Sequence, residues 1–302
     1  MFEWTLISLL LALSVGGAVG FLSGLFGVGG GFLLVPFLNA VLGIPMAVAV
    51  GSTACYTIGP ATAALLARKP TAGFFELPLI LSGGLLVGVW WGATTLNDLQ
   101  LTETISVFGR QLPAADLMVL LCYLVLMTVI ATMSFIDAWC FEASAGVRRR
   151  GYLTRIHLPP MATIPDLRPA RYSIPLLSGT AVVIGFLSGF LGMSGGLVLV
   201  PAAIYLLGLR VHDATTITIV TVWIVSVQST VMHAGHGHVQ LPLVAALLFS
   251  GTTGARLGAQ IGVRMSASRL KLGFGLLVLV SAAIVSAKLW TLWQTANGLE
   301  AA

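Results

Sequence analysis

Charged residues are scarce in this chain of 302 residues. Asp, Glu, Lys and Arg together make up 8% of it, while 57% of the residues are hydrophobic; soluble domains carry about 25% charged residues. A chain with so little charge cannot cover a water-facing surface, which excludes a soluble enzyme, a disordered chain and a secreted disulfide scaffold. Because one bilayer crossing takes about 20 apolar residues, the composition predicts an all-α polytopic membrane protein.

Several kinds of reactive chemistry are also missing. The three cysteines, Cys55, Cys122 and Cys140, show no metal-ligand spacing, so we expect no disulfide and no metal site. There is no ATP-binding motif, no HExxH motif, and no Asp or Glu at the middle of an apolar run. These absences argue against a primary pump, a metalloprotease and strong proton coupling. We therefore expect no enzyme activity and no cofactor. We also expect no nucleic-acid partner, because membrane proteins place Lys and Arg by sidedness and a net positive charge does not indicate nucleic-acid binding here.

The sequence contains an internal repeat. Residues 20–36 (GFLSGLFGVGGGFLLVP) and 185–201 (GFLSGFLGMSGGLVLVP) are identical at eleven of seventeen positions, at an offset of 165 residues. Such self-similarity indicates two homologous halves. Charges and turn residues bracket five apolar runs in each half, namely 5–24, 29–43, 46–67, 77–96 and 116–136, then 174–192, 194–208, 213–234, 242–263 and 271–293.

A polar, arginine-rich stretch separates the halves. Residues 137–172 hold six arginines, and threading the chain outward from them puts twelve of the fourteen loop Lys and Arg residues on the same side. By the positive-inside rule that side is cytoplasmic. We therefore predict a first transmembrane repeat over 1–136, a cytoplasmic basic linker over 137–172 and a second repeat over 173–302. Five crossings are an odd number, so the repeats are inverted and both termini lie outside.

Each repeat carries a glycine-rich break followed by a short segment that contains Pro36 or Pro201. Each segment has fifteen residues, which gives a helix of roughly 22 Å against a hydrocarbon core of ~30 Å; it either spans or re-enters. A helix that starts at depth offers free N–H groups and a positive dipole end, which together suit an anion. Close helix packing is the alternative reason for glycine. The predicted anion-binding residues at the breaks are Ser23, Gly27, Gly29, Gly30, Gly31, Ser188, Gly192, Ser194, Gly195 and Gly196.

These paired motifs resemble the signature of the sulfite exporter TauE/SafE family of anion permeases. The later stretches HAGHGHVQLPL and GTTGARLGAQIG are similar to the end of that family's second half, so the resemblance covers the chain except residues 97–115 and 137–172. It implies a transporter of small sulfur-containing anions, organosulfonates or related carboxylates in the prokaryotic plasma (inner) membrane. The substrate class comes from the resemblance alone.

Other polar residues lie in apolar surroundings. Arg256 either compensates substrate charge or reaches toward the interface from about two turns away. The histidines of HAGHGH have no Cys or carboxylate nearby, which argues against zinc, and we place His233 and His236 in the outer vestibule, with Pro36 and Pro201 as gating positions. Hydroxyls and an amide after the breaks either face the anion or bond neighbouring helices; the predicted ligands among them are Ser52, Thr53, Thr218, Thr221 and Gln228.

The leading prediction is a secondary transporter that exports sulfite or an organosulfonate, with the anion and membrane lipid as partners and a homodimer left open. The direction is not fixed by sequence, so an importer or a channel for related anions remains an alternative. A membrane-embedded hydrolase or metalloenzyme using HAGHGH, Arg256 and a serine is less favoured. The identity of the anion and of the coupling ion stays open.

Overall fold

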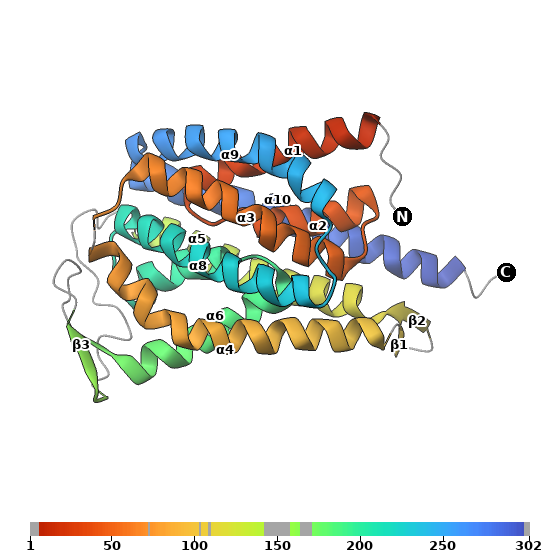
Figure 1. Ribbon diagram of the computed structural model, residues 1–302, viewed down its shortest axis with the longest axis horizontal. Coiled ribbons are helices and arrows are strands. Elements are labelled where there is room, and N and C mark those ends of the chain that lie inside the picture. Colours follow the sequence, from red (N-terminus) through yellow and green to blue (C-terminus); the bar gives the residue numbers. More distant parts are fainter. Residues whose placement is uncertain are drawn as a thin grey trace.

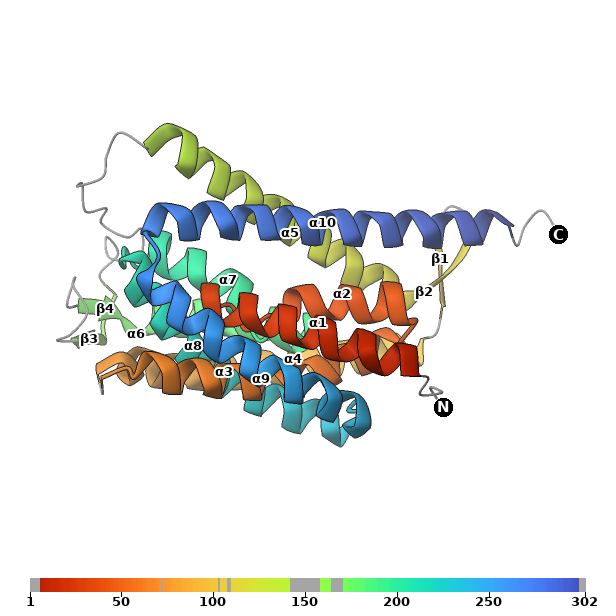
Figure 2. The same cartoon turned by 90° about the horizontal axis from the view of Figure 1, so that it is seen from above.

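The computed structural model describes residues 6–71, 73–102, 104–107, 110–141, 158–163 and 171–298. Within these residues the chain forms ten α-helices and two β-hairpins, and one of the helices continues as a short π-helix. Most of the long helices run lengthwise through the molecule (Figure 1). Residues near both termini and the hairpin β1–β2 lie at one end, called here the termini end, and β3 and β4 lie at the opposite or linker end (Figures 1 and 2).

The elements follow the predicted apolar runs within a few residues. The first half comprises α1 (Leu6–Phe26), α2 (Gly31–Leu42), α3 (Met46–Arg68), α4 (Gly73–Leu101), β1 (Thr104–Val107), β2 (Arg110–Pro113) and α5 (Ala114–Phe141). The second comprises β3 (Met161–Thr163), β4 (Arg171–Ser173), α6 (Ile174–Leu191), α7 (Gly196–Pro201), the π-helix η2 (Ala202–Leu206), α8 (Val211–Gly235), α9 (Leu241–Arg264) and α10 (Ala267–Gly298). Both hairpins are antiparallel.

The helices have the length and polarity of membrane spans. Among the described residues, seven of them (α3, α4, α5, α6, α8, α9 and α10) are long and apolar enough to cross a membrane, and Leu10–Phe26, Gly31–Leu42 and Gly196–Leu206 are shorter apolar helices. The all-α polytopic class is confirmed. Most of the linker 137–172 lies outside the described residues, although α5 extends into its start as far as Phe141. Its cytoplasmic location stays a prediction.

Helices of one half pack mainly on helices of the other. α1 lies along α9, and α4 lies along α6; by the offset of the repeat, α6 is the counterpart of α1 and α9 that of α4. α3 contacts α8 and α5 contacts α10, and Figure 2 shows this last pair along one side of the molecule. In both figures α1 starts at the termini end and α6 at the linker end. The two halves therefore interlock instead of forming separate domains.

Glycine allows the close approach of the two interlocking pairs. A Cβ atom on Gly20 of α1 would lie 2.2 Å from the carbonyl oxygen of Gly251 on α9, and one on Gly88 of α4 would lie 2.2 Å from that of Val182 on α6. The same holds for Gly24, where the distance to the oxygen of Ala255 is 2.0 Å. Close backbone packing, the alternative explanation for glycine, is therefore correct along these two seams.

Candidate functional site

The two breaks are tight turns that use the left-handed region of backbone space. In the first break φ is +74° at Gly27, +78° at Gly29 and +73° at Gly30. The second break repeats positive φ at the equivalent positions, where Ser194 at +53° is the one residue with a side chain. This conformation costs roughly 1–2 kcal/mol for a residue with a Cβ atom, which explains why nearly all of these positions are glycine.

The fold presses the two breaks against each other. A Cβ atom on Gly31 would lie 2.7 Å from the carbonyl oxygen of Gly192, and one on Gly196 would lie 1.8 Å from that of Val28. Every residue from 27 to 31 and from 190 to 197 is buried. The structure therefore brings the predicted glycines of both halves into one place, while their role in binding stays a prediction.

Each break ends in a helix N-terminus without a side-chain cap. α2 starts after Gly30 and α7 after Gly195, and neither position has a capping hydrogen bond. In α2, Leu33 and Leu34 are the first N–H groups to donate, both to the oxygen of Gly30, and α7 repeats this arrangement at Gly195. Within the described chain, the N–H groups of Gly31 and Phe32 donate to no backbone carbonyl. Such free donors at a positive dipole end suit an anion.

Buried hydroxyl groups without partners lie on α3, α6 and α8 and in the second break. Thr53 on α3 and Thr218 on α8 occupy equivalent positions in the repeat, and each is at most 1% exposed. Their hydroxyls, and those of Ser188 and Ser194, have no hydrogen-bond partner in the part of the chain that the structure describes. A buried hydroxyl left unpaired costs about 1–3 kcal/mol. These four groups therefore have hydrogen-bonding capacity left for a bound polar species.

Other predicted ligands have structural partners. The hydroxyl of Ser52 accepts from the N–H of Gln240 at 3.0 Å, and Thr221 donates to Ile217 of its own helix at 2.9 Å. Gln228 is only half-buried, although its Oε1 atom has no partner among the described residues. Ser23 is buried beside the first break, since a Cβ atom on Gly30 would lie 3.2 Å from its own Cβ. For Ser52 and Thr221 the packing explanation is sufficient.

Arg256 does not join the breaks. Its side chain is exposed on α9, where it lines a groove of about 540 Å³ together with Lys69, Thr252 and Gln260. The groove lies between α3 and α9, and none of its lining residues belongs to a break. Of the two explanations that the sequence left open, this position favours a guanidinium that reaches toward the membrane interface.

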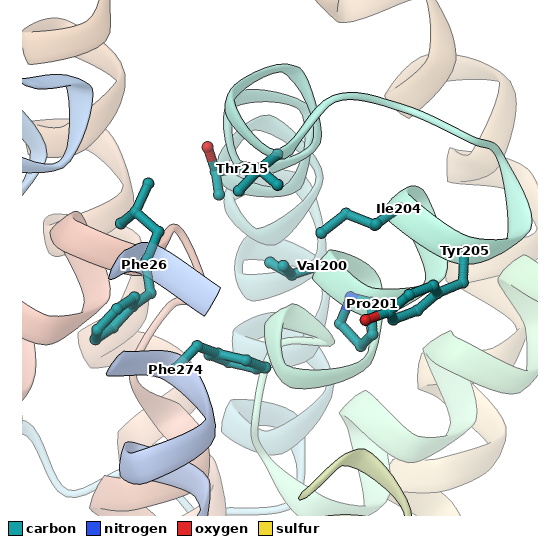
Figure 3. A pocket seen from close by; sticks show the side chains of 9 residues that line it. Phe26, Val200, Pro201, Ile204, Tyr205, Thr215 and Phe274 are labelled. Atoms are coloured by element: carbon teal, nitrogen blue, oxygen red, sulfur yellow. The ribbon is translucent and has the colours of Figure 1, made fainter. Parts of the chain in front are cut away.

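The cavities beside the breaks are small. Figure 3 shows one with Phe26 and Phe274 on one side and Ile204 and Tyr205 on the other; its volume is about 30 Å³. Pro201, where α7 passes into η2, also lines it. A second cavity of about 30 Å³, lined mostly by apolar side chains, includes Thr218. Each has room for about one water molecule, so neither admits a sulfonate without movement of the helices.

The histidines of HAGHGH differ in burial. His233 is fully buried, and its Nε2 atom lies 2.9 Å from the carbonyl oxygen of Gly189 on α6. His238 is also buried, whereas His236 is half-buried. No cluster of three or more His, Cys, Asp or Glu that could hold a metal occurs among the described residues. Pro36 and Pro201 are buried inside the equivalent helices α2 and α7. Their gating roles, and that of His236, stay predictions.

One residue beside the site was missed in the sequence. Arg68 ends α3, and its guanidinium donates to the oxygen of Gly24 at 3.0 Å, to that of Leu25 at 3.3 Å and to the hydroxyl of Thr215 at 2.8 Å. In the sequence it counted only as a loop cation. The available signal was the repeat offset, which pairs Arg68 with His233.

Comparison with known proteins identifies the family. The family model described as "Sulfite exporter TauE/SafE" matches residues 2–108 and 105–285. The chain belongs to the sulfite exporter TauE/SafE family. Two "probable membrane transporter" proteins of Xylella fastidiosa, from strains 9a5c and Temecula1, are each 26% identical over 299 residues, covering 96% of this chain and 98% of the relative. The "probable membrane transporter protein YunE" of Bacillus subtilis is 32% identical over 99 residues, covering 32% of this chain and 36% of that protein.

Membership of the TauE/SafE family confirms the resemblance drawn from the paired glycine motifs. With the seven long apolar helices, it makes the chain a multi-pass membrane transporter. No solved structure matches it. The anion and the direction of transport are not given by these comparisons.

Proposed function

We propose that this TauE/SafE family member is a secondary transporter that exports a small sulfur-containing anion, such as sulfite or an organosulfonate, from the prokaryotic cytoplasm. The anion is held between the breaks by the N–H groups of Gly29–Gly31 and Ser194–Gly196. The observation that carries this proposal is the direct contact of two uncapped helix N-termini from opposite halves. The linker faces the cytoplasm, and the multi-pass chain lies in the plasma membrane.

Backbone dipoles supply the positive potential in this proposal. Each helix N-terminus carries about half an elementary charge, so the two together offer about one charge to a monoanion or dianion. Neutral hydroxyls add hydrogen bonds: those of Thr53, Thr218, Ser188 and Ser194 are buried and unpaired within the described residues. A protein that binds its anion this way needs no buried lysine at the site, which suits a chain with 8% charged residues.

Alternating access follows from the interlocked packing. We take the halves as inverted repeats, with the anion site where they meet. The seams α1–α9 and α4–α6 are in backbone contact through glycine, so each pair moves as one body. Because the break residues are all buried, the anion reaches them only when one pair rocks away from the other. An importer would use the same rocking motion to move the anion in the opposite direction. A channel would be open at both ends at once.

Flux into proteoliposomes tests the proposal. A panel of sulfite, thiosulfate, sulfate, taurine, sulfoacetate and small carboxylates should show saturable transport of one or more sulfur-containing anions and none of a cation such as choline.

The control variant is Gly179→Ala in α6, which has open space around the new Cβ atom and should transport normally. Gly43→Ala is not a suitable control because Gly43 has a left-handed φ of 63°. If no anion of the panel is bound or moved by well-folded protein, the proposal is wrong; unsaturable flux near the diffusive rate would make the protein a channel.

A further inference from the structure

The equivalent helices α3 and α8 carry stripes of different chemistry at matching positions of the repeat. On α8 one face presents Thr218, Val222, Ser226, Ser229 and His233, which recur every three or four residues and so share one side of the helix. Each is at most 1% exposed. Within the described chain, the hydroxyls of the threonine and both serines have no partner. A buried face that is polar at all these positions except Val222 therefore runs inside the protein toward the C-terminal end of α8.

The equivalent face of α3 is apolar at the two positions that carry serine on α8. It presents Thr53, Thr57, Ala61, Ala64 and Arg68, so alanines stand where α8 has Ser226 and Ser229. Both faces contact the first break. A Cβ atom on Gly29 would lie 3.0 Å from Cγ2 of Thr57 on α3 and 2.7 Å from Cγ1 of Val222 on α8. The two faces thus start from one point, and α3 ends at the linker end whereas α8 ends toward the termini end (Figures 1 and 2).

Both stripes end on a basic side chain that binds the same carbonyl of its own half. Arg68 donates to the oxygen of Gly24 at 3.0 Å, and His233 lies with Nε2 2.9 Å from the oxygen of Gly189, the repeat counterpart of Gly24. These oxygens belong to the last turns of α1 and α6, where the helix dipole favours a positive charge. The first half has a fixed charge at this position, and the second half has a group that ionises.

The contact also defines which atom of His233 takes the proton. A carbonyl oxygen only accepts, so Nε2 carries the hydrogen in the contact with Gly189. The Nδ1 atom has no partner among the residues that the structure describes, and it is therefore free to be protonated. Protonation at this atom keeps the existing hydrogen bond and adds one positive charge.

Two further histidines of the same stretch interact with His233. The ring centroid of His238 lies 5.8 Å away, and that of His236 lies 5.7 Å from His238. Burial, with a smaller contribution from His236, lowers the pKa of His238. His233 is buried more deeply than His238, so burial opposes protonation of both rings. The charged residues on the elements packed against α8 are Arg68 on α3 and Glu76 and Asp98 on α4, while α6, α7 and η2 carry none.

We propose that His233 is the proton-binding site of the transporter, and that its protonation is coupled to binding of the anion at the breaks. This inference rests on the proposed function and names its coupling ion. A proton on His233 gives the second half the charge that Arg68 gives the first half permanently. The lack of intramembrane carboxylates led us to expect no strong proton coupling; a buried imidazole, which ionises near neutral pH when unperturbed, provides a different route.

The coupling has a definite sign. A protonated His233 attracts the anion, and by reciprocity a bound anion favours protonation by the same factor. Anion affinity should therefore rise as the pH falls through the range in which His233 titrates. Couplings of this kind typically change affinity by about 5-fold to 150-fold. We expect tighter binding at about pH 6 than at about pH 8, by less than the full coupling because burial disfavours the charged imidazole.

Binding at two pH values to the full-length protein in nanodiscs tests this proposal. Thiosulfate, sulfate and sulfoacetate are the probes, because their charge does not change between about pH 6 and about pH 8. In His233→Gln the amide still donates to Gly189 but takes no proton, so affinity should stay at the weak level at both pH values. His233→Arg should bind tightly at both. His212→Gln, a histidine on the first turn of α8, is the matched control and should keep the pH dependence of the unmodified protein.

The outcomes separate this inference from the proposed function. Equal affinity at both pH values in the unmodified protein, or a pH dependence that survives in His233→Gln, would overturn the inference and leave the anion site intact. If none of the three probes binds, both fail. Should His233→Arg not fold, His233→Gln carries the test. In proteoliposomes, a trapped pH-sensitive dye should report proton movement with thiosulfate flux in the unmodified protein and not in His233→Gln.

Discussion

Glycine serves two different purposes in the seams and in the breaks. Along the seams α1–α9 and α4–α6, residues such as Gly20 and Gly88 have ordinary helical backbone, and a side chain would strike the neighbouring helix. In the breaks, Gly30 and Gly195 have positive φ, and the conformation itself disfavours a side chain. The seams hold helices together, whereas in the described chain the breaks leave helix N–H groups without backbone partners. A sequence pattern rich in glycine therefore does not by itself identify a binding site.

The largest effect should follow from a β-branched side chain in a break. Gly30→Val and Gly195→Val force valine to φ values of +73° and +74°, which L-residues adopt at a cost, and each turn should lose the geometry that presents its N–H groups. We expect anion binding to be abolished, measured as loss of the anion-induced rise in the unfolding temperature.

Ser194→Gly is the matched control for these variants. Ser194 already has φ of +53°, so glycine fits the same turn with less strain, and only one hydroxyl is lost. Most of the anion affinity should remain. If Ser194→Gly loses binding as completely as Gly195→Val, side-chain chemistry and not the backbone supplies the site.

A smaller effect should follow from a methyl group in a seam. Gly88→Ala places Cβ 2.2 Å from the oxygen of Val182, whereas the nearby Gly83 of the same helix has nothing within 4 Å of such an atom. Overpacking of this kind typically costs about 1–3 kcal/mol, and alanine at an open helical position gains up to about 1 kcal/mol.

Thermal unfolding in detergent distinguishes the two variants of α4. The transition temperature should fall by several degrees in Gly88→Ala and stay level or rise in Gly83→Ala. Anion affinity per folded molecule should be unchanged in both, because neither residue belongs to a break. Equal stability of the two variants would show that the α4–α6 seam does not depend on backbone contact.

The two uses of glycine also explain how much the sequence could predict. Hydrophobic runs are long and strongly apolar here, so all ten segments could be placed, and the repeat located both breaks. Partners across the fold could not be predicted: Ser52 bonds Gln240 and Arg68 bonds Gly24, and such contacts depend on which helices meet. The main partner of α1 is α9, which is far away in the sequence. Seam glycines and break glycines therefore cannot be told apart from the sequence until it is known which helices pack together.

The smallest effect should come from a charge on a seam helix. Arg256 follows Ala255, whose oxygen contacts the α1 seam, but its own side chain is exposed in the groove with Lys69. If the potential at the breaks comes from backbone dipoles alone, Arg256→Gln should keep anion affinity and flux within about twofold of the unmodified protein, a change below about 0.5 kcal/mol. Arg256→Lys should match it. A tenfold loss in Arg256→Gln that Arg256→Lys restores would instead place a fixed positive charge from α9 in the path of the anion, and the seam helices would then belong to the transport pathway.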